Sequence, residues 1–359
     1  MTLPVNPPLK PMLAKSVEKI PEGDFIYEPK WDGFRCLVFR DGDEITLGSR
    51  NDRPLTRYFP ELLDPLRAML PDRCVVDGEL VVTTSHGTDF DQLGQRIHPA
   101  ESRVQKLSVE TPASFVAFDL IALDDLDLRP LPFRQRHETL FSVLGSAEAP
   151  IFLTPSTEDP ATAADWFERF EGAGFDGVIA KPAGEPYVSD KRTQFKIKHR
   201  RTADVVVGGY RVHKNGGVGS LLVGVFGDEG NLHHIGVATG FDTAKRAALL
   251  EELAPYEVDA FVGHPWAQWA DAAAHVQGDQ RLPGAPSRWS STKTLDWTPM
   301  RCELVAEIAY QGLQNGARLR HPGTFLRWRP DKDPSQCRYD QMDQVAPAEL
   351  AELFGIPRT

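Results

Sequence analysis

The sequence has few cysteines, no long apolar run and no excess of positive charge, and each absence excludes a class of protein. Its four cysteines, Cys36, Cys74, Cys302 and Cys337, form no CxxC pair. Their spacing therefore predicts neither a zinc site nor a disulfide framework and favours a reducing cytoplasm. No apolar stretch reaches the roughly 18 residues that cross a bilayer, and the proline-rich start of the chain lacks a signal-peptide core. Walker A and HExxH motifs are also absent.

Positive charge is scarce overall but concentrated locally. The net charge is −11, from 40 Lys and Arg against 51 Asp and Glu. Taken alone, this total argues against a nucleic-acid partner, because phosphate binding needs positive charge. Residues 181–214, however, hold nine basic against three acidic residues, and residues 311–338 hold six against two. Charge alone therefore leaves a nucleic-acid partner open, because binding depends on where the charge lies. If the motifs assign these segments to phosphate, binding should be local and strongly weakened by salt.

The length of 359 residues predicts two domains, and 29 Gly with 29 Pro favour a β-rich, α+β protein. The dipeptides Asp32-Gly33 and Asp41-Gly42 predict two tight turns joining three strands. Apolar patterning predicts the other elements of the first domain, residues 1–201. The expected strands are Phe25–Lys30, Phe34–Arg40, Glu44–Leu47, Cys74–Val82, Phe115–Leu123, Gly177–Lys181 and Thr193–Lys198, and the expected helices are 59–70, Leu131–Leu144 and Ala161–Ala173.

The pattern changes near residue 202, where short strands replace the mixed elements. Five strands with one interrupting helix are typical of a small, partly open β-barrel of the OB type, here residues 202–359. The Trp-rich stretch Gly263–Thr298 has little periodicity and is predicted to be a long loop. The expected strands are Asp204–Val212, Ser220–Phe226, Leu232–Thr239, Leu304–Tyr310 and Phe325–Arg329, with a helix at Thr243–Leu253.

The peptide from Glu28 to Arg35, EPKWDGFR, is the most informative part of the chain. By itself it fits a plain hairpin with a solvated Lys30. Further chemistry-bearing residues follow in order at strand-like positions, and buried strands rarely hold carboxylates without a partner or a metal. These residues are Asp77 and Glu79, Phe118, Asp176, and Lys196 with Lys198 on one face of a strand.

Together these residues supply what nucleotidyl transfer requires. A lysine amine attacks an α-phosphate only when deprotonated, and nearby cations and a divalent metal lower its pKa. Carboxylates hold a hard cation that neutralises phosphate oxygens. Lys196 and Lys198 would place positive charge where negative charge develops in the transition state.

With these motifs in place, the sequence resembles the ATP-dependent DNA ligases of the covalent nucleotidyltransferase superfamily, most of all the short bacterial repair enzymes called ligase C. The resemblance spans nearly the whole chain and is weakest over 203–300. It implies an adenylation domain of antiparallel sheets with flanking helices, followed by an OB-fold domain. The matching segments are Lys30–Arg35, Ser49–Asn51, Asp77–Glu79, Phe118-Asp119, Asp176-Gly177, Lys196–Lys198 and Leu319–Lys332, with further similarity at Pro11–Ala14, Phe90–Arg96 and His98–Ala100.

The resemblance also implies a role for each matching residue. Lys30 would form lysyl-AMP, and Glu28 would accept a hydrogen bond from the adenine amino group. Phe118 would stack on adenine, Glu79 would hold the ribose or a metal, and Asp176, where the family usually has Glu, would be the second metal carboxylate. The remaining residues would contact phosphate: Arg35 and Arg50 the nucleotide and the 5′-phosphate of the nick, Lys196 and Lys198 the α-phosphate, and Arg329, Asp331 and Lys332 the pyrophosphate leaving group.

The implied function is sealing of nicks in duplex DNA, in DNA repair, with ATP as co-substrate and Mg²⁺ or Mn²⁺ as cofactor. The expected protein is a cytoplasmic monomer without a membrane partner, working beside repair polymerases or nucleases. A hinge is expected near residue 202. Two alternatives stay open at this point: an RNA ligase or capping-type nucleotidyltransferase of the same superfamily, and a non-catalytic OB-type nucleic-acid-binding protein.

Overall fold

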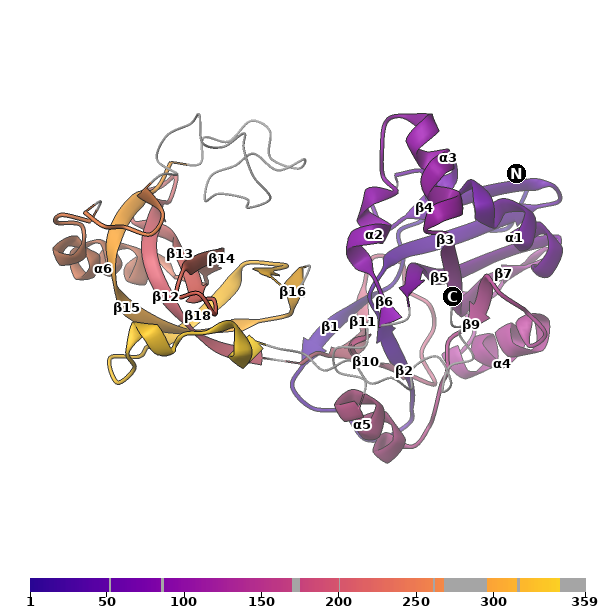
Figure 1. The fold of residues 1–359 in the computed structure, drawn as a ribbon. Helices are drawn as coiled ribbons and strands as arrows, with labels where there is room; N and C mark the ends of the chain where they lie inside the picture. The colour runs from indigo at the N-terminus through magenta and orange to yellow at the C-terminus, as the bar shows by residue number, and fades with distance from the viewer. Residues whose placement is uncertain are drawn as a thin grey trace. The chain divides into compact units, whose positions relative to one another are not determined.

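The chain forms two compact units, Met1–His199 and Arg200–Asp343 (Figure 1). The computed structural model describes residues 1–51, 53–84, 87–169, 175–199, 201–260, 262–267, 296–314 and 317–342. Among these residues, no helix is both long enough and apolar enough to span a membrane.

Two β-sheets form the centre of the first unit. The larger has seven strands in the order β4-β3-β5-β7-β8, with β6 beside β5 and β9 beside β7. The smaller has four strands in the order β1-β11-β10-β2. The strands are β1 (Leu13–Val17), β2 (Phe25–Trp31), β3 (Phe34–Asp41), β4 (Glu44–Ser49), β5 (Arg73–Thr84), β6 (Gly87–Thr88), β7 (Ala113–Leu123), β8 (Leu126–Asp127), β9 (Ile151–Leu153), β10 (Phe175–Pro182) and β11 (Arg192–Ile197).

Helices cover one face of each sheet. Alternate apolar residues of the larger sheet, such as Val38 and Phe115, pack against Leu66 and Leu140 of the helices in the main core. The smaller sheet packs the side chains of Tyr27, Val178 and Ile197 against Ala163 of α5. The helices are η1 (Thr56–Tyr58), η2 (Pro60–Leu62), α1 (Leu63–Met69), α2 (Phe90–Gln95), α3 (Glu101–Glu110), α4 (Phe133–Leu144) and α5 (Pro160–Arg169).

The expected turn at Asp32-Gly33 is wrong as a hairpin turn. In the part of the chain that the structure describes, strand β2 pairs with β10, and β3 pairs with β4 and β5, so this bend carries the chain from one sheet to the other. Gly33 passes so close to β5 that a Cβ atom would lie 2.1 Å from the carbonyl oxygen of Leu80. The second turn is confirmed, since Asp41 pairs with Glu44 across the β3–β4 hairpin.

One helix prediction needs correction, two helices were missed, and one predicted helix is tested only in part. The helix expected over 59–70 is a 3-10 turn followed by the short α1. Helices α2 and α3 were not predicted, because α3 buries only Val104 and Ser108 and so shows little apolar periodicity. The described part of α5 ends at Arg169, and the last residues of the expected Ala161–Ala173 helix lie outside the described residues.

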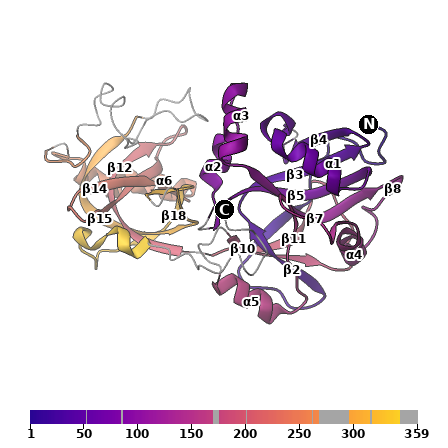
Figure 2. The ribbon, with the colours of Figure 1, turned by 45° about the vertical axis from the view of Figure 1, so that its right-hand side comes forward.

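The second unit is a five-stranded OB-type barrel in the order β12-β13-β14-β18-β15 (Figure 2). The barrel is closed, not partly open, because β15 at the end of this order pairs with β12 over Arg201–Tyr210. The predicted helix, α6, lies in the chain between the third and fourth strands. The elements are β12 (Arg201–Val212), β13 (Val218–Phe226), β14 (Leu232–Thr239), α6 (Thr243–Leu253), η3 (Ala254–Tyr256), β15 (Thr298–Tyr310), β16 (Leu313–Gln314), β17 (Arg318–Leu319), β18 (Gly323–Trp328), η6 (Pro334–Gln336) and η7 (Tyr339–Met342).

Most of the expected Gly263–Thr298 loop lies outside the described residues. Its described beginning contains Trp266, which is fully buried against Val206, Leu222 and Leu232 of the barrel. The Trp266 indole donates a 2.9 Å hydrogen bond to the carbonyl oxygen of Leu232. This tryptophan therefore packs in a second apolar cluster on the outer face of the barrel, opposite the face that carries the core residues Val205 and Val207.

Candidate active site

A pocket lies between the two sheets of the first unit, and most of the predicted site residues line it. One wall is the four-stranded sheet, where successive side chains alternate between the α5 face and the pocket face. The pairing of Ile179 with both Glu28 and Lys196 aligns strands β2, β10 and β11 across this wall. Its alternate residues are Glu28 and Lys30, Ile179 and Lys181, and Gln194 and Lys196. Arg35, Glu79 and Phe118, from β3, β5 and β7, form the opposite wall.

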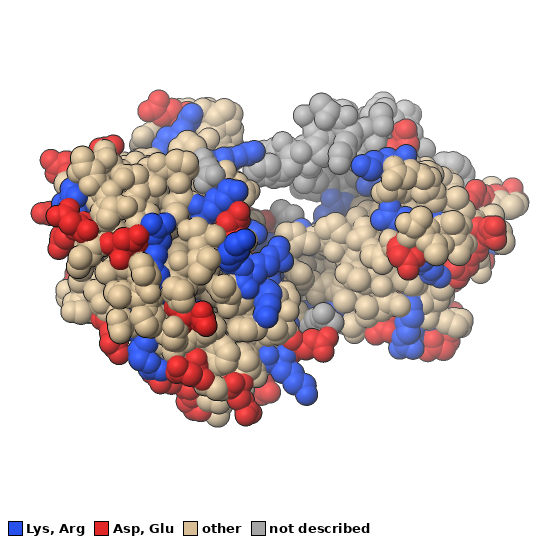
Figure 3. All heavy atoms as spheres, turned by 180° about the vertical axis from the view of Figure 1, so that it is seen from behind, with Lys and Arg blue, Asp and Glu red and all other residues tan. Residues whose placement is uncertain are grey.

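Cations gather around Lys30 and Lys196. Burial lowers the pKa of Lys196, and the positive charges of Lys198, Lys30, Arg50 and the neighbouring arginine of β11 lower it further. Lys198 follows directly after β11, and Arg50 follows β4 at the exposed rim of the pocket. Lys and Arg side chains also gather on one part of the first unit's surface, whereas acidic side chains are dispersed (Figure 3). Such a cluster of positive charge attracts phosphate groups.

The carboxylate of Glu79 lines the pocket. Burial raises its pKa to about 7, although the charges of Arg35 and Lys30 partly offset this effect. The side chain of Asp176 lies outside the described residues. Within the described part of the chain, no three His, Cys, Asp or Glu side chains form a metal-binding group. The site therefore offers Glu79 as one oxygen ligand, an arrangement that suits Mg²⁺ when substrate phosphates and water complete its coordination.

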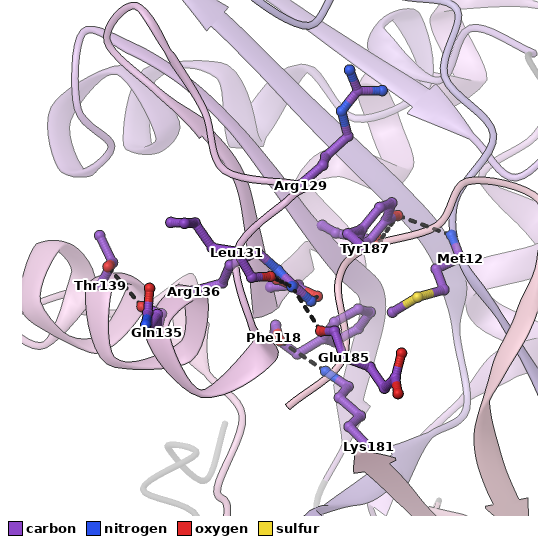
Figure 4. Close-up of polar contacts among 12 residues, drawn as sticks. Met12, Phe118, Arg129, Leu131, Gln135, Arg136, Thr139, Lys181, Glu185 and Tyr187 are labelled. Atoms are coloured by element: carbon purple, nitrogen blue, oxygen red, sulfur yellow. Dashed lines mark hydrogen bonds and ion pairs between the residues drawn. The ribbon is translucent and has the colours of Figure 1, made fainter. Parts of the chain in front are cut away.

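Glu28, Lys181 and Phe118 meet at one end of the pocket. The Lys181 ammonium lies 2.9 and 2.8 Å from the two carboxylate oxygens of Glu28. It also donates a 2.8 Å hydrogen bond to the carbonyl oxygen of Phe118, which Figure 4 shows. Both charged residues are only 2% exposed. Burial raises the pKa of Glu28 to about 7, and Lys181 opposes this increase. Lys181 was not among the predicted site residues.

Arg35 is fixed by an ion pair beneath the pocket. Its guanidinium donates hydrogen bonds of 2.6 and 2.7 Å to the two oxygens of Asp77 and lies 4.4 Å from the centre of the Phe118 ring. The hydroxyl of Tyr187 donates a 2.6 Å hydrogen bond to Asp77 and accepts one from the backbone of Met12. Asp77 is fully buried, so its carboxylate is used to hold Arg35 and Tyr187.

Motif residues that touch no pocket surface also position the site. Asp119 accepts hydrogen bonds of 2.9 and 3.0 Å from the fully buried Arg136 of α4, which fixes β7 beside Phe118. Gly177 has a φ of 128°, and a Cβ atom there would lie 1.9 Å from the carbonyl oxygen of Ile197. Glycine at this position therefore permits the approach of β10 to β11.

The predicted C-terminal residues lie together in the second unit, held by one carboxylate. Arg329 and Lys332 donate hydrogen bonds of 2.9 and 2.6 Å to Asp204, which stands near the start of β12. Arg329 also pairs with Asp331 and lowers the pKa of that carboxyl to about 2. The amide of Gln341 bonds both the backbone N–H and the carbonyl oxygen of Asp204. These contacts join the tail motif to the first strand of the barrel.

Sequence reasoning missed Lys181 and Asp204 and gave Asp77 no individual role. A signal existed for Lys181, because a lysine at the end of the apolar run Val178–Ala180 needs a buried partner. The partner itself, Glu28, is 153 residues away. No local pattern links Asp204 to Arg329, which is 125 residues away. Only the fold brings these groups together.

Comparison with known proteins gives consistent matches along the chain. Residues 11–198 match the model of the ATP dependent DNA ligase domain, and residues 214–332 match that of the ATP dependent DNA ligase C terminal region. The chain is 54% identical to DNA ligase C of Mycobacterium tuberculosis, over 98% of this chain and 99% of the relative. It is 51% identical to DNA ligase C2 of Mycolicibacterium smegmatis, over 96% of each. A solved structure of a Lig E DNA ligase, at 17% identity, shares the fold with a TM-score of 0.54, covering 89% of this chain and 99% of that one.

Proposed function

The chain belongs to the ATP-dependent DNA ligase family, an enzyme family with ATP as co-substrate, and we propose that Lys30 is its nucleophile in sealing nicks in duplex DNA. The observation that carries this proposal is the position of Lys30 in the pocket between the sheets. There it lies among cations suited to phosphate and opposite the carboxylate of Glu79. This combination is what attack on the α-phosphate of ATP requires.

The reaction proceeds in three displacements at phosphorus. The deprotonated Lys30 amine forms a P–N bond to the α-phosphorus of ATP while the bond to pyrophosphate breaks, and the nitrogen gives up one proton and keeps one. The 5′-phosphate of a nick then forms a P–O bond to the same phosphorus while the P–N bond breaks, and lysine leaves as the amine by taking up a proton. The 3′-hydroxyl attacks that 5′-phosphate, loses its proton and releases AMP. Lys196 and Lys198 stabilise the charge that develops on the phosphate oxygens in the first step, with Arg35 and Arg50 contacting the nucleotide and the 5′-phosphate.

At the base end of the pocket, Glu28 accepts a hydrogen bond from the adenine amino group and Phe118 stacks on the base, a contact worth about 1–3 kcal/mol in comparable sites. Mg²⁺ or Mn²⁺ would be held by Glu79 and Asp176, and when bound it neutralises phosphate oxygens. In the first step Arg329, Asp331 and Lys332 orient the pyrophosphate leaving group. This action requires a hinge near residue 202 between the domains 1–201 and 202–359.

The biological setting is DNA repair by a cytoplasmic monomer. Besides the ligases above, the chain is 32% identical, over 91% of its length, to the multifunctional non-homologous end joining DNA repair protein LigD of M. tuberculosis. That relative's name supports a repair role, in which repair polymerases or nucleases would act beside this chain.

Incubation with ATP labelled in the α-phosphate, followed by addition of nicked DNA, tests the proposal. Wild-type protein should become labelled and then pass the label to DNA. Lys30→Ala should lose both reactions, whereas Lys106→Ala, a control at an exposed lysine of α3 outside the pocket, should keep them. Covalent labelling that persists in Lys30→Ala would overturn the assignment. GTP and nicked RNA in parallel reactions test nucleotide and strand preference.

A further inference from the structure

Lys181 occupies a position that none of the motif assignments explains. It lies on β10 in the four-stranded wall of the pocket, and it bonds both Glu28 on the neighbouring β2 and the carbonyl oxygen of Phe118 on β7 of the opposite wall. Its ammonium also lies 4.6 Å from the centre of the Phe118 ring and 4.6 Å from that of Phe133. One buried side chain therefore joins the two walls at the base end of the pocket.

We propose that Lys181 is a positioning residue for adenine recognition, which orients Glu28 and keeps it ionised as the acceptor of the adenine amino group. This inference rests on the proposed function of the pocket. A buried carboxylate without a partner takes up a proton and then presents one O–H donor, which is repelled by an amino donor. Held by an ammonium group, the carboxylate keeps its oxygens as acceptors in a fixed direction.

The charges around Glu28 show why Lys181 matters most. Lys181 approaches from β10 and Arg35 from β3, and both favour the carboxylate, whereas Asp119 on β7 disfavours it. The guanidinium of Arg35 already donates two hydrogen bonds to Asp77, from Nε and Nη2. Removal of Lys181 therefore leaves Glu28 buried with no hydrogen-bonded cation, and its pKa rises above the present value of about 7.

The first test compares ATP with purine riboside triphosphate, which lacks the 6-amino group, as donors in protein labelling. Wild type should prefer ATP by about tenfold or more, because the analogue leaves Glu28 without its donor. In Lys181→Met and Lys181→Gln this preference should fall to about threefold or less. Lys106→Met, which breaks an exposed pair with Glu110 on α3, controls for the loss of one positive charge and should keep the wild-type preference.

The pH profile gives a second measurement. Because Lys181 lowers the pKa of Glu28, the Lys181→Met variant should bind ATP poorly at pH 7 and recover affinity as the pH rises. A residue that only stabilised the fold would change the melting temperature without moving this profile. An unchanged ATP preference together with an unchanged pH profile in Lys181→Met would overturn the proposal.

A double variant separates action through Glu28 from independent action. Glu28→Gln with Lys181→Met removes both charges of the buried pair, a change that proteins often tolerate better than the loss of one charge. It should match Glu28→Gln alone in nucleotide preference and in pH profile. If the double variant prefers ATP even less than Glu28→Gln does, Lys181 acts independently of Glu28, and the inference is refuted. If wild type is not labelled at all, the proposed function fails instead.

Discussion

The two units hold their phosphate-binding candidates in opposite electrostatic states. In the first unit Lys196 is surrounded by other cations, and no described carboxylate lies within ion-pair distance of it. In the second unit Arg329 and Lys332 are both paired with Asp204, and Arg329 also with Asp331. The pocket is thus prepared for an anion before the anion arrives. To orient pyrophosphate as proposed, Arg329 and Lys332 would have to exchange their carboxylate partners for phosphate.

The largest expected effect comes from removing charge in the prepared pocket. Lys196→Met should slow formation of lysyl-AMP by about 10²–10³-fold, because the lost cation faces charge that develops in the transition state. Single-turnover labelling with ATP measures this rate, with Lys191→Met as the matched control on the exposed loop before β11. A loss of less than about threefold would show that the cation cluster is not part of the chemistry.

Salt should distinguish the exposed cations from those in the pocket. Affinity for nicked duplex DNA should fall about a hundredfold between roughly 50 and 200 mM salt, because DNA binding releases counterions. Labelling by ATP should change far less, since buried charges are screened less. Fluorescence anisotropy of a nicked duplex, measured alongside labelling, checks both. If salt weakened DNA binding and ATP labelling equally, the proposed difference between exposed cations and pocket cations would be contradicted.

Protonation of Glu79 should set metal affinity near neutral pH. With a pKa of about 7, raised by burial, the carboxylate is mostly neutral at pH 6 and mostly charged at pH 8. The apparent affinity for Mg²⁺ in the labelling reaction should therefore rise about tenfold over this range. Titration of Mg²⁺ at each pH measures it. Glu79→Gln should remove the pH dependence, and a variant that keeps it would assign the effect to another group.

The same raised pKa has a consequence for stability. Because the folded pKa of Glu79 lies above its ordinary value of 4.5, its contribution to the free energy of unfolding is complete below about pH 4.5 and is lost as the pH rises through about 7. Urea unfolding measures the free energy of unfolding at pH 5 and pH 8. The decrease between these two pH values should be smaller in Glu79→Gln than in wild type.

The smallest effect is expected at the tail. Asp204→Asn removes the shared carboxylate and should strengthen binding of pyrophosphate in the reverse reaction of lysyl-AMP about fivefold, since Arg329 and Lys332 lose a competing anion. Asp228→Asn, which breaks the ion pair of this fully exposed carboxylate with Arg338 in the same unit, should have no effect. Weaker pyrophosphate binding in Asp204→Asn would instead mean that this carboxylate orients the two cations.

Local patterns predicted the elements better than they predicted their partners. The β3–β4 hairpin follows from Asp41-Gly42, and the barrel strands follow from alternating apolar residues. Strand β1 was missed because it contains no buried residue and forms by parallel pairing with β11, far along the chain. The Asp32-Gly33 bend was misread for the same reason, since a turn dipeptide does not show which strands pair across it.

Site residues that belong to a local motif were predicted, whereas residues that depend on a distant partner were missed. The pocket residues Lys30, Glu79 and Lys196 were predicted because each belongs to a short motif, and the fold brings them to one cavity. Groups whose role depends on a distant partner, such as Lys181 with Glu28, carry no local signature of that role. Long-range ion pairs are set by tertiary packing, which a single sequence does not display.

The strand order of the smaller sheet also determines when the pocket can form during synthesis. In the order β1-β11-β10-β2, the two outer strands are made first and the two central strands last. Strand β2 therefore remains without its sheet partner until Phe175–Pro182 has been made, and β1 remains without its partner until Arg192–Ile197 has been made. The larger sheet is complete by Leu153. Lys30, on β2, is thus made well before the strand on which its place in the pocket depends.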